Sequence, residues 1–360
     1  MRASTASRRQ QGMSLMEMIV AMAIGLIGIT IITQVYLVNE NVKRSTVSSG
    51  GAQVNGTLAL YNLERDIRMA GYGIAHSAGL GCNTINYYYN GTYSQPPVVS
   101  TLPTMYMAPV TIVTTAGQPD SVNTLYGSAQ DRPLPAIILQ NMPGFNSDIV
   151  PDNQLGFYSG DFLILSSGAR CTLTQLVANP AATGNNLRHD SSTGSLYNPG
   201  APAFAAYFQG SYVFDLGPTP VSRTYSVSSG PSGGLNMTTI LPAAAAGTTT
   251  LVDSIVDMRV RYGKDDGGGG GVPDDGTVDT WDTVTPTTAA GWQQVLAVRI
   301  AVLGRSEHYE KPSSGSACDA SSATLAWSGG TFAIAAANRC YKHRVFETVV
   351  PMRNMIWRTQ

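Results

Sequence analysis

The stretch QGMSLME at residues 11–17, followed by the apolar run at residues 18–38, decides how the rest of the chain is arranged. The run from Met18 to Val38 contains 21 residues and no charged side chain. As a helix it would measure roughly 32 Å at about 1.5 Å per residue, enough to cross a hydrocarbon core of about 30 Å. A secretory signal has a shorter apolar region, about 7 to 15 residues, and ends in a small-residue cleavage site. We therefore expect a membrane anchor.

Basic residues flank the run on both sides. Arg2, Arg8 and Arg9 precede it, and Lys43-Arg44 follows it. Lys and Arg collect on the cytoplasmic side of a membrane helix, so the three arginines outweigh the two later residues. The C-terminal part is expected to be exported.

Glu17 is a single carboxylate at the edge of the apolar run, and such a charge costs up to a few kcal/mol as it enters lipid. Ser14 and Glu17 have the spacing of a capping box, in which each side chain satisfies a free N–H group at the start of a helix. Pairing of the Glu17 carboxylate with a positive group of a neighbouring subunit would neutralise the charge in a second way.

The composition limits the function classes. The chain has 360 residues, a net charge of −1 and 12% charged side chains, about half of the usual share near 25%. A net charge near zero predicts no general attraction to nucleic acid, so no nucleic-acid partner is expected. The four histidines are scattered and form no metal-binding or catalytic spacing, so we expect a protein that is not an enzyme.

Cys82, Cys171, Cys318 and Cys340 are widely spaced and include no C-x-x-C pair. Zinc sites and redox motifs use close pairs, whereas an even number of cysteines in an exported domain favours disulfides. Three pairings are open. We prefer the pairing of Cys82 with Cys171 and of Cys318 with Cys340, because each bond then joins cysteines that are neighbours in the sequence.

Helical periodicity continues after Val38. Two apolar stripes recur every three or four residues and end near Met69, where Gly71 and Gly73 follow as stop signals. Gly50-Gly51 and Gly56 weaken the middle of this helix, so we expect a kink there. The stripes comprise Val54, Leu58 and Tyr61, and Leu60, Leu63 and Ile67.

Beyond Gly73 the pattern changes to short β-type runs between Gly, Pro, Ser and Asn clusters. The clearest runs are 111–115, 136–140, 161–166, 171–177, 211–215, 223–228, 257–262, 295–303 and 345–350. Segments 83–110, 178–204 and 265–291 are expected to be long loops. The fold class is therefore α+β: a long N-terminal helix, first transmembrane and then amphipathic, packed on an antiparallel-rich sheet.

Two loops contain residues with binding potential. Asp265, Asp266, Asp274, Asp275 and Asp279 form the densest carboxylate cluster, and Ca²⁺ takes six to eight oxygen ligands from such loops. The spacing is not that of an EF-hand, and a solvated loop is the alternative. No cofactor is required, and calcium is the one candidate ligand.

Four tyrosines, at 87–89 and 93, lie in the expected loop 83–110. Hairpin or core packing is one use for them, and a recognition surface is the other.

The residues 11–38 resemble the class III signal of type IV pilins and pseudopilins. The resemblance implies that a prepilin peptidase cuts between Gly12 and Met13 and that Met13 becomes N-methylated. It also implies that Glu17, the fifth residue of the mature chain, pairs with the terminal amine of a neighbouring subunit. Many major pilins carry a proline where this chain has Gln34, so the helix melting linked to that proline is not implied.

The segment RDIRMAGY at 65–72, followed by Cys82, narrows the resemblance to large minor pilins of the PilW type. Gly160-Asp161-Phe162-Leu163 before Cys171, residues 257–263, and the tail from Arg344 to Asn354 are similar as well. The implied architecture is the ladle-like pilin fold. Its parts are a leader at 1–12, a transmembrane or filament-core helix at 13–40, an amphipathic helix at 41–72 and an exported β-rich domain at 73–360.

The implied function is priming of type IV pilus assembly in a tip or initiation complex, within a system for adhesion and twitching motility. The implied partners are other minor pilins, the major pilin, the prepilin peptidase and a large adhesin-type tip protein. The implied location is the inner membrane, with the C-terminal domain in the periplasm, and then the extracellular fimbrium. The alternatives are a minor pseudopilin of type II secretion (GspJ type) and a pilin that itself binds a ligand, as an adhesin or a DNA-binding protein.

Overall fold

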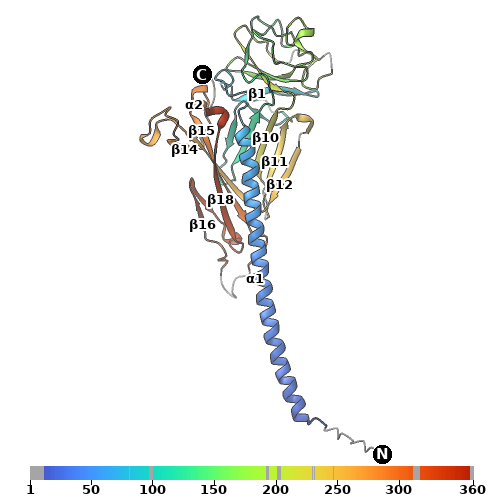
Figure 1. Ribbon diagram of the computed structural model, residues 1–360, viewed down its shortest axis with the longest axis vertical. Helices are drawn as coiled ribbons and strands as arrows, with labels where there is room; N and C mark the ends of the chain where they lie inside the picture. Colours follow the sequence, from blue (N-terminus) through green and yellow to red (C-terminus); the bar gives the residue numbers. More distant parts are fainter. Residues whose placement is uncertain are drawn as a thin grey trace, which may run out of the picture.

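The computed structural model describes residues 12–80, 82–96, 100–191, 194–200, 204–228, 230, 232–245, 247–310 and 317–356. A single long helix projects from a β-rich globular part, and its N-terminal half stands free of the rest (Figure 1). The leader residues 1–11, with Arg2, Arg8 and Arg9, lie outside the described residues. The α+β class and the ladle shape expected from the sequence are confirmed.

The projecting helix is α1 (Leu15–Met69), 55 residues long, and its apolar window has a mean hydropathy of 2.4. The helix runs without a break through Gly50, Gly51 and Gly56, where we expected a kink. Gly56 packs directly against the ring of Phe346 on the adjacent sheet, and no side chain fits there, because an added Cβ would lie 2.2 Å from that ring. At Gly51 an added Cβ would meet only open space.

We predict opposite effects for alanine at these two glycines. Gly51→Ala should stabilise the protein by up to about 1 kcal/mol, because alanine is the better helix former. Gly56→Ala should destabilise it by about 1 to 3 kcal/mol, because the methyl group overpacks the Phe346 contact. Urea unfolding of both variants measures this, and Phe346→Leu should restore much of the stability lost in Gly56→Ala. Equal effects at the two positions would contradict the packing explanation.

Three sheets and a hairpin make up the described globular part. A seven-stranded sheet has the order β2-β1-β8-β7-β9-β6, with β3 paired to β1, and a five-stranded sheet has the order β12-β11-β10-β5-β4. The third sheet is β14-β13-β15-β18, and β16 pairs with β17. Among the described strand pairs only β1 with β8 is parallel. The strands are β1 (Thr84–Tyr89), β2 (Thr92–Ser94), β3 (Met105–Tyr106), β4 (Val110–Val113), β5 (Ser121–Tyr126), β6 (Ala136–Ile137), β7 (Phe162–Ser166), β8 (Cys171–Gln175), β9 (Tyr212–Gly217), β10 (Val221–Val227), β11 (Gly234–Leu241), β12 (Gly247–Asp253), β13 (Ile255–Lys264), β14 (Thr280–Asp282), β15 (Val295–Arg305), β16 (Thr324–Trp327), β17 (Gly330–Ala333) and β18 (His343–Pro351).

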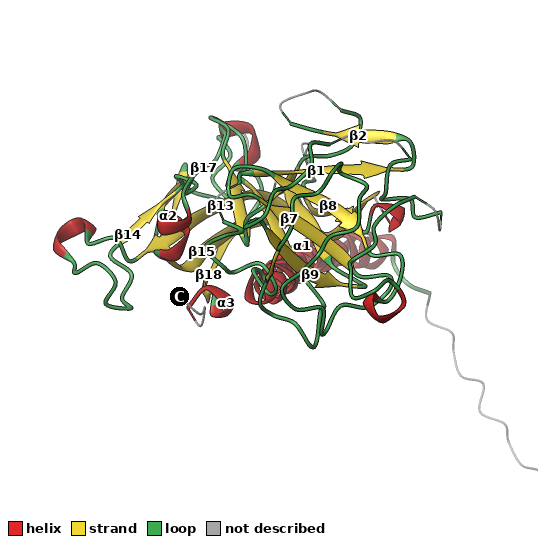
Figure 2. Cartoon of the chain, turned by 90° about the horizontal axis from the view of Figure 1, so that it is seen from above, coloured by secondary structure: helices red, strands yellow, loops and turns green. Residues whose placement is uncertain are grey.

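Short helices connect or follow these strands. They are the 3-10 turns η1 (Pro180–Ala182), η2 (Ala243–Ala245), η3 (Gly268–Gly270) and η4 (Ala336–Asn338), and the helices α2 (Ala289–Gln293) and α3 (Arg353–Ile356). In the view from above, α1 is seen end on beneath the sheets, and α3 lies beside it (Figure 2).

The main core lies where the second half of α1 packs against the five- and four-stranded sheets. Ala59, Leu63 and Ile67 are fully buried on that face of the helix, together with Tyr225 of β10 and Val302 of β15. Helical spacing of three and four residues therefore places one stripe on the sheets, as expected from the sequence.

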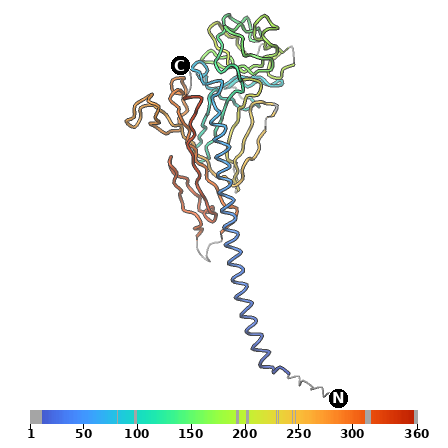
Figure 3. The backbone as a smooth tube through the Cα atoms, viewed as in Figure 1, coloured from blue at the N-terminus to red at the C-terminus, as the bar shows by residue number. Residues whose placement is uncertain are grey.

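The seven-stranded sheet lies at the end of the molecule farthest from the N-terminus (Figure 3). This sheet has a buried hydrophobic cluster on each of its two faces. The side chains of β7 contribute to both clusters, because successive residues of a strand point to opposite faces. Phe162 and Ile164 belong to one buried cluster, and Leu163 and Leu165 belong to the other.

Both disulfides have the pairing preferred from the sequence. Cys82 bonds to Cys171 across 89 residues, and Cys318 bonds to Cys340 across 22. The second joins the chain before β16 to the chain after β17. The β16–β17 hairpin between them packs its Trp327 and Phe332 on Ala301 and Leu303 of β15. The hairpin covers the face of the four-stranded sheet that points away from α1.

The expected strands are all present in part, but two of the expected loops are not simply loops. Segment 83–110 contains β1, β2 and β3, and Tyr87 is fully buried there. The rings of Tyr88 and Tyr93 are 4.9 Å apart across the β1–β2 pair, so hairpin packing is their use in this fold. Segment 265–291 contains β14, and segment 178–204 is irregular apart from η1 in its described residues.

Candidate functional site on the projecting helix

The free half of α1 exposes a band of apolar side chains. Leu26 is 67% exposed, Ile29 63% and Ile32 69%, and the whole apolar window is unburied. Soluble monomers rarely expose a continuous apolar surface of this size, which marks a membrane or protein contact. By length and composition this helix can cross a membrane.

The start of the helix is capped as its sequence predicted. The Ser14 Oγ accepts a hydrogen bond from the Glu17 N–H at 3.3 Å, and the Glu17 Oε2 accepts one from the Ser14 N–H at 3.1 Å. The capping box is therefore confirmed. The Glu17 carboxylate also lies at the N-terminal end of the helix, where the helix dipole favours a negative charge. Gly12 and Met13 immediately precede this cap.

Polar contacts fix α1 to the globular part where the helix emerges. Ser45 Oγ donates to the Glu310 carboxylate at 2.8 Å, and the Lys342 ammonium donates to Ser45 Oγ at 2.7 Å. Lys342 also pairs with Glu310 at 2.9 Å, and Ser48 Oγ accepts from the His308 N–H at 2.8 Å. The helix and the base of the domain are thus held in one relative orientation.

Asp66 is a charged residue buried at the centre of the helix–sheet contact. Its side chain is 1% exposed and accepts from the Arg223 guanidinium at 2.8 Å and from the Tyr225 hydroxyl at 2.5 Å. The Tyr126 hydroxyl donates to its other oxygen at 3.3 Å. Two strands, β5 and β10, therefore bind one carboxylate of α1.

The two tyrosines keep their protons in this arrangement. Burial, then the charge of Asp66, raises the pKa of Tyr126 to about 12. Burial and the same carboxylate also raise the pKa of Tyr225. Both hydroxyls therefore stay donors over the whole physiological range. The sequence pattern predicts that Asp66 lies with Glu64, Arg65 and Arg68 on faces of the helix away from the apolar stripes, and this prediction is wrong because Asp66 is buried. The available signal was its place between Leu63 and Ile67, on the buried stripe.

The aspartates of segment 265–279 accept hydrogen bonds from their own loop and its flanking strand. Asp265 accepts from Gly276 N–H at 2.7 Å, Asp279 from Gly267 N–H at 2.7 Å, and Asp266 from Thr280 Oγ1 at 2.8 Å. Asp275 accepts from Thr277 N–H, and Asp274 has a positive φ of 61°. The loop extends sideways from the body beyond β14 (Figure 2).

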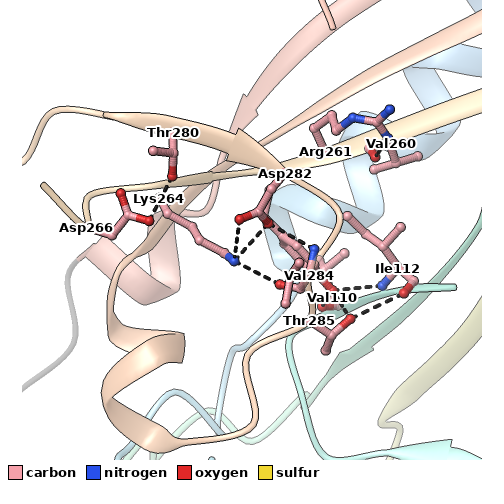
Figure 4. Close-up of polar contacts among 11 residues, drawn as sticks. Val110, Ile112, Val260, Arg261, Lys264, Asp266, Thr280, Asp282, Val284 and Thr285 are labelled. Carbon is pink, nitrogen blue, oxygen red and sulfur yellow. Dashed lines mark hydrogen bonds and ion pairs between the residues drawn. The ribbon is translucent and has the colours of Figure 1, made fainter. Parts of the chain in front are cut away.

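Lys264 neutralises the base of that loop. Its ammonium lies 2.8 Å from the Asp282 carboxylate and donates to the Val284 carbonyl at 2.9 Å (Figure 4). Within the described residues, no three or more His, Cys, Asp or Glu are grouped so that they could hold a metal ion. Calcium binding here stays a prediction.

His189 is the most buried histidine of the described chain and serves the distal core. Its ring nitrogens contact Thr174 Oγ1 at 3.1 Å and the Ser147 carbonyl at 3.0 Å. Burial lowers its pKa to about 4, so it is neutral at physiological pH. Its bonding partners give it a structural role.

Comparison with known proteins gives two family matches. Residues 7–33 match the prokaryotic N-terminal methylation motif, and residues 224–354 match the family of the type IV pilus-assembly protein W (PilW). Neither the curated proteins nor the solved structures give a match. The first match covers residues 7–12 of the expected leader and the first 19 residues of α1, up to Thr33. The second begins within β10, at Thr224, and continues through β18, so it includes Tyr225 and the whole four-stranded sheet but not Arg223.

Proposed function

We propose that this chain, whose two family matches support a type IV pilus minor pilin or pseudopilin, is a PilW-type minor pilin that primes pilus assembly. The matches point to a structural pilin-type protein rather than to an enzyme. The observation that carries the proposal is the free apolar half of α1, which begins within the methylation motif and continues as a rigid helix into the PilW-matched domain.

In this proposal residues 1–12 are removed by the prepilin peptidase, and the new terminus at Met13 is methylated. Residues 13–40 anchor the chain in the inner membrane and later enter the filament core. Residues 41–72 dock on the sheets of the exported domain, residues 73–360, which lies in the periplasm before assembly. The motif and the apolar helix fit membrane anchoring followed by incorporation into a pilus.

The partners proposed are other minor pilins and the major pilin, in a tip or initiation complex. The seven-stranded sheet supports this placement, because it lies at the distal end of the molecule and would point away from the filament shaft (Figure 1). A large adhesin-type protein at that end is the further partner we propose.

A strain in which the gene for this chain is deleted would show whether the chain serves a type IV pilus or a type II secretion pseudopilus. Surface pili counted by electron microscopy should fall at least tenfold without this chain, while secretion of exported enzymes should stay at the wild-type level. Wild-type numbers of pili with lost secretion would instead assign the chain to a type II secretion pseudopilus. Restoration by the wild-type gene on a plasmid is the control.

A further inference from the structure

A groove of about 540 Å³ lies where α1 leaves the globular part. One wall is the helix, with Glu40, Lys43 and Arg44, and the other belongs to the domain base, with Ser254, Glu307 and His308. The polar tie between Ser48 and the His308 N–H, 2.8 Å long, fixes the two walls relative to each other. The groove is therefore a preformed feature of the docked helix.

Both signs of charge remain available in this groove. Arg44 and Glu40 pair with each other at 2.8 Å, one turn apart on the helix. Lys43 and Glu307 are exposed, and in the described part of the chain neither has an ion-pair partner. A ligand that carries a positive and a negative group would satisfy both residues.

The groove also lies at a defined distance from the apolar run. Lys43 follows Val38 by five residues, which is about 8 Å along a helix at about 1.5 Å per residue. The headgroup layer on each side of a bilayer is about 5 to 8 Å thick, given a hydrocarbon core of about 30 Å and a total of about 40 to 45 Å. When residues 18–38 span the hydrocarbon, the membrane-side end of the groove opens into the headgroups.

We propose that in the membrane-inserted chain this groove binds the headgroup of an aminophospholipid of the phosphatidylethanolamine type. Lys43 and Arg44 contact the phosphate, and Glu307 accepts hydrogen bonds from the primary ammonium. Val47, which is 68% exposed, also lines the groove. The inference rests on the proposed membrane-inserted stage and names a ligand for it.

The zwitterionic headgroup is preferred for a chemical reason. A primary ammonium has three N–H donors, like a lysine side chain, whereas the quaternary ammonium of a choline lipid has none. The neutral glycerol of an anionic glycerol lipid would offer Glu307 hydroxyl donors but no positive charge, so the carboxylate would stay without a counterion. The unpaired carboxylate therefore selects among lipids that all carry a phosphate.

Native mass spectrometry of the full chain in detergent tests the site, with phosphatidylethanolamine, phosphatidylcholine and phosphatidylglycerol of the same acyl chains added in turn. The wild-type chain should retain phosphatidylethanolamine best. Lys43→Gln and Glu307→Gln should each lower that retention about two- to fivefold, the range for partly exposed charge contacts. Arg188→Gln is the matched control, because Arg188 is an exposed cation of the distal part, paired with Asp148.

The two variants together distinguish a specific headgroup site from non-specific electrostatic attraction between the protein and anionic lipid. Simple attraction to anionic lipid would be weakened by Lys43→Gln and strengthened by Glu307→Gln, whereas the proposed site is weakened by both. Equal retention of the three lipids, unchanged retention in both variants, or displacement of the lipid by millimolar inorganic phosphate would overturn the proposal. Failure of the proposed function would instead appear as normal piliation of the deletion strain, which this experiment does not measure.

Discussion

Replacing Asp66 with alanine should lower the free energy of unfolding by about 3 to 5 kcal/mol, the range for breaking a buried ion pair by removing one partner. The substitution leaves the Arg223 guanidinium without its carboxylate in a site where its side chain is only 23% exposed. It also removes the acceptor of the Tyr225 and Tyr126 hydroxyls. Thermal and urea unfolding of the full chain in detergent measure the loss.

Two variants make this prediction specific. Glu64→Ala removes a carboxylate two residues away that pairs with Arg68 on the helix surface, and it should cost less than about 0.5 kcal/mol. The double variant Asp66→Leu, Arg223→Leu should be more stable than Asp66→Ala, because no buried charge is left unpaired. An Asp66→Ala protein within about 1 kcal/mol of the wild type would show that the network does not hold α1 on the sheets.

Replacing Glu17 with alanine should reduce the amount of this chain in sheared filaments by at least about tenfold, while the chain still inserts into the membrane. In the proposed assembly the helix moves from lipid into an apolar filament core, where the free amine at Met13 of a neighbouring subunit needs a negative partner. Every 1.4 kcal/mol of lost contact lowers an association constant about tenfold, and a charge pair in a low-dielectric interior exceeds that value. Quantitative immunoblotting of filament and membrane fractions measures the ratio.

Ser14→Ala is the control that separates the two roles of Glu17. It breaks the capping box, which costs about 1 kcal/mol of helix stability, but leaves the carboxylate in place. If the charge serves assembly, Ser14→Ala enters filaments nearly normally and Glu17→Ala does not. Normal incorporation of both variants would remove the assembly role of Glu17.

Local sequence signals predicted the helix and most strands because those signals do not depend on distant residues. The uncharged run at 18–38, the stripe through Leu63 and Ile67, and the Ser14–Glu17 cap act within a few turns of one helix. The strands β7 and β15 are mostly apolar runs, and β8 has the sequence CTLTQ, in which apolar and polar residues alternate, so local pattern predicts all three. The disulfide pairing followed from the preference for sequence neighbours.

Features that depend on distant partners were missed. Gly56 looked like a weak point in the helix because its contact, Phe346, lies 290 positions later in the chain. The sequence pattern predicts Asp66 on a polar face of the helix, although its partners on β5 and β10 bury it. The prediction of a loop at β1 and β2 is wrong for the same reason, because these strands are supported by the hairpin's tyrosine rings and by pairing with β8.

The mass of the N-terminal peptide of the mature chain shows most directly whether the chain is processed as a prepilin. Chain purified from the envelope of a wild-type strain, and from a strain without the prepilin peptidase, would be digested and compared by mass spectrometry. We expect the wild-type chain to begin at Met13 with one added methyl group, and the chain from the peptidase mutant to retain the leader of residues 1–12. A wild-type chain that retains residues 1–12, or that is cut on the C-terminal side of the apolar run, would contradict this expectation.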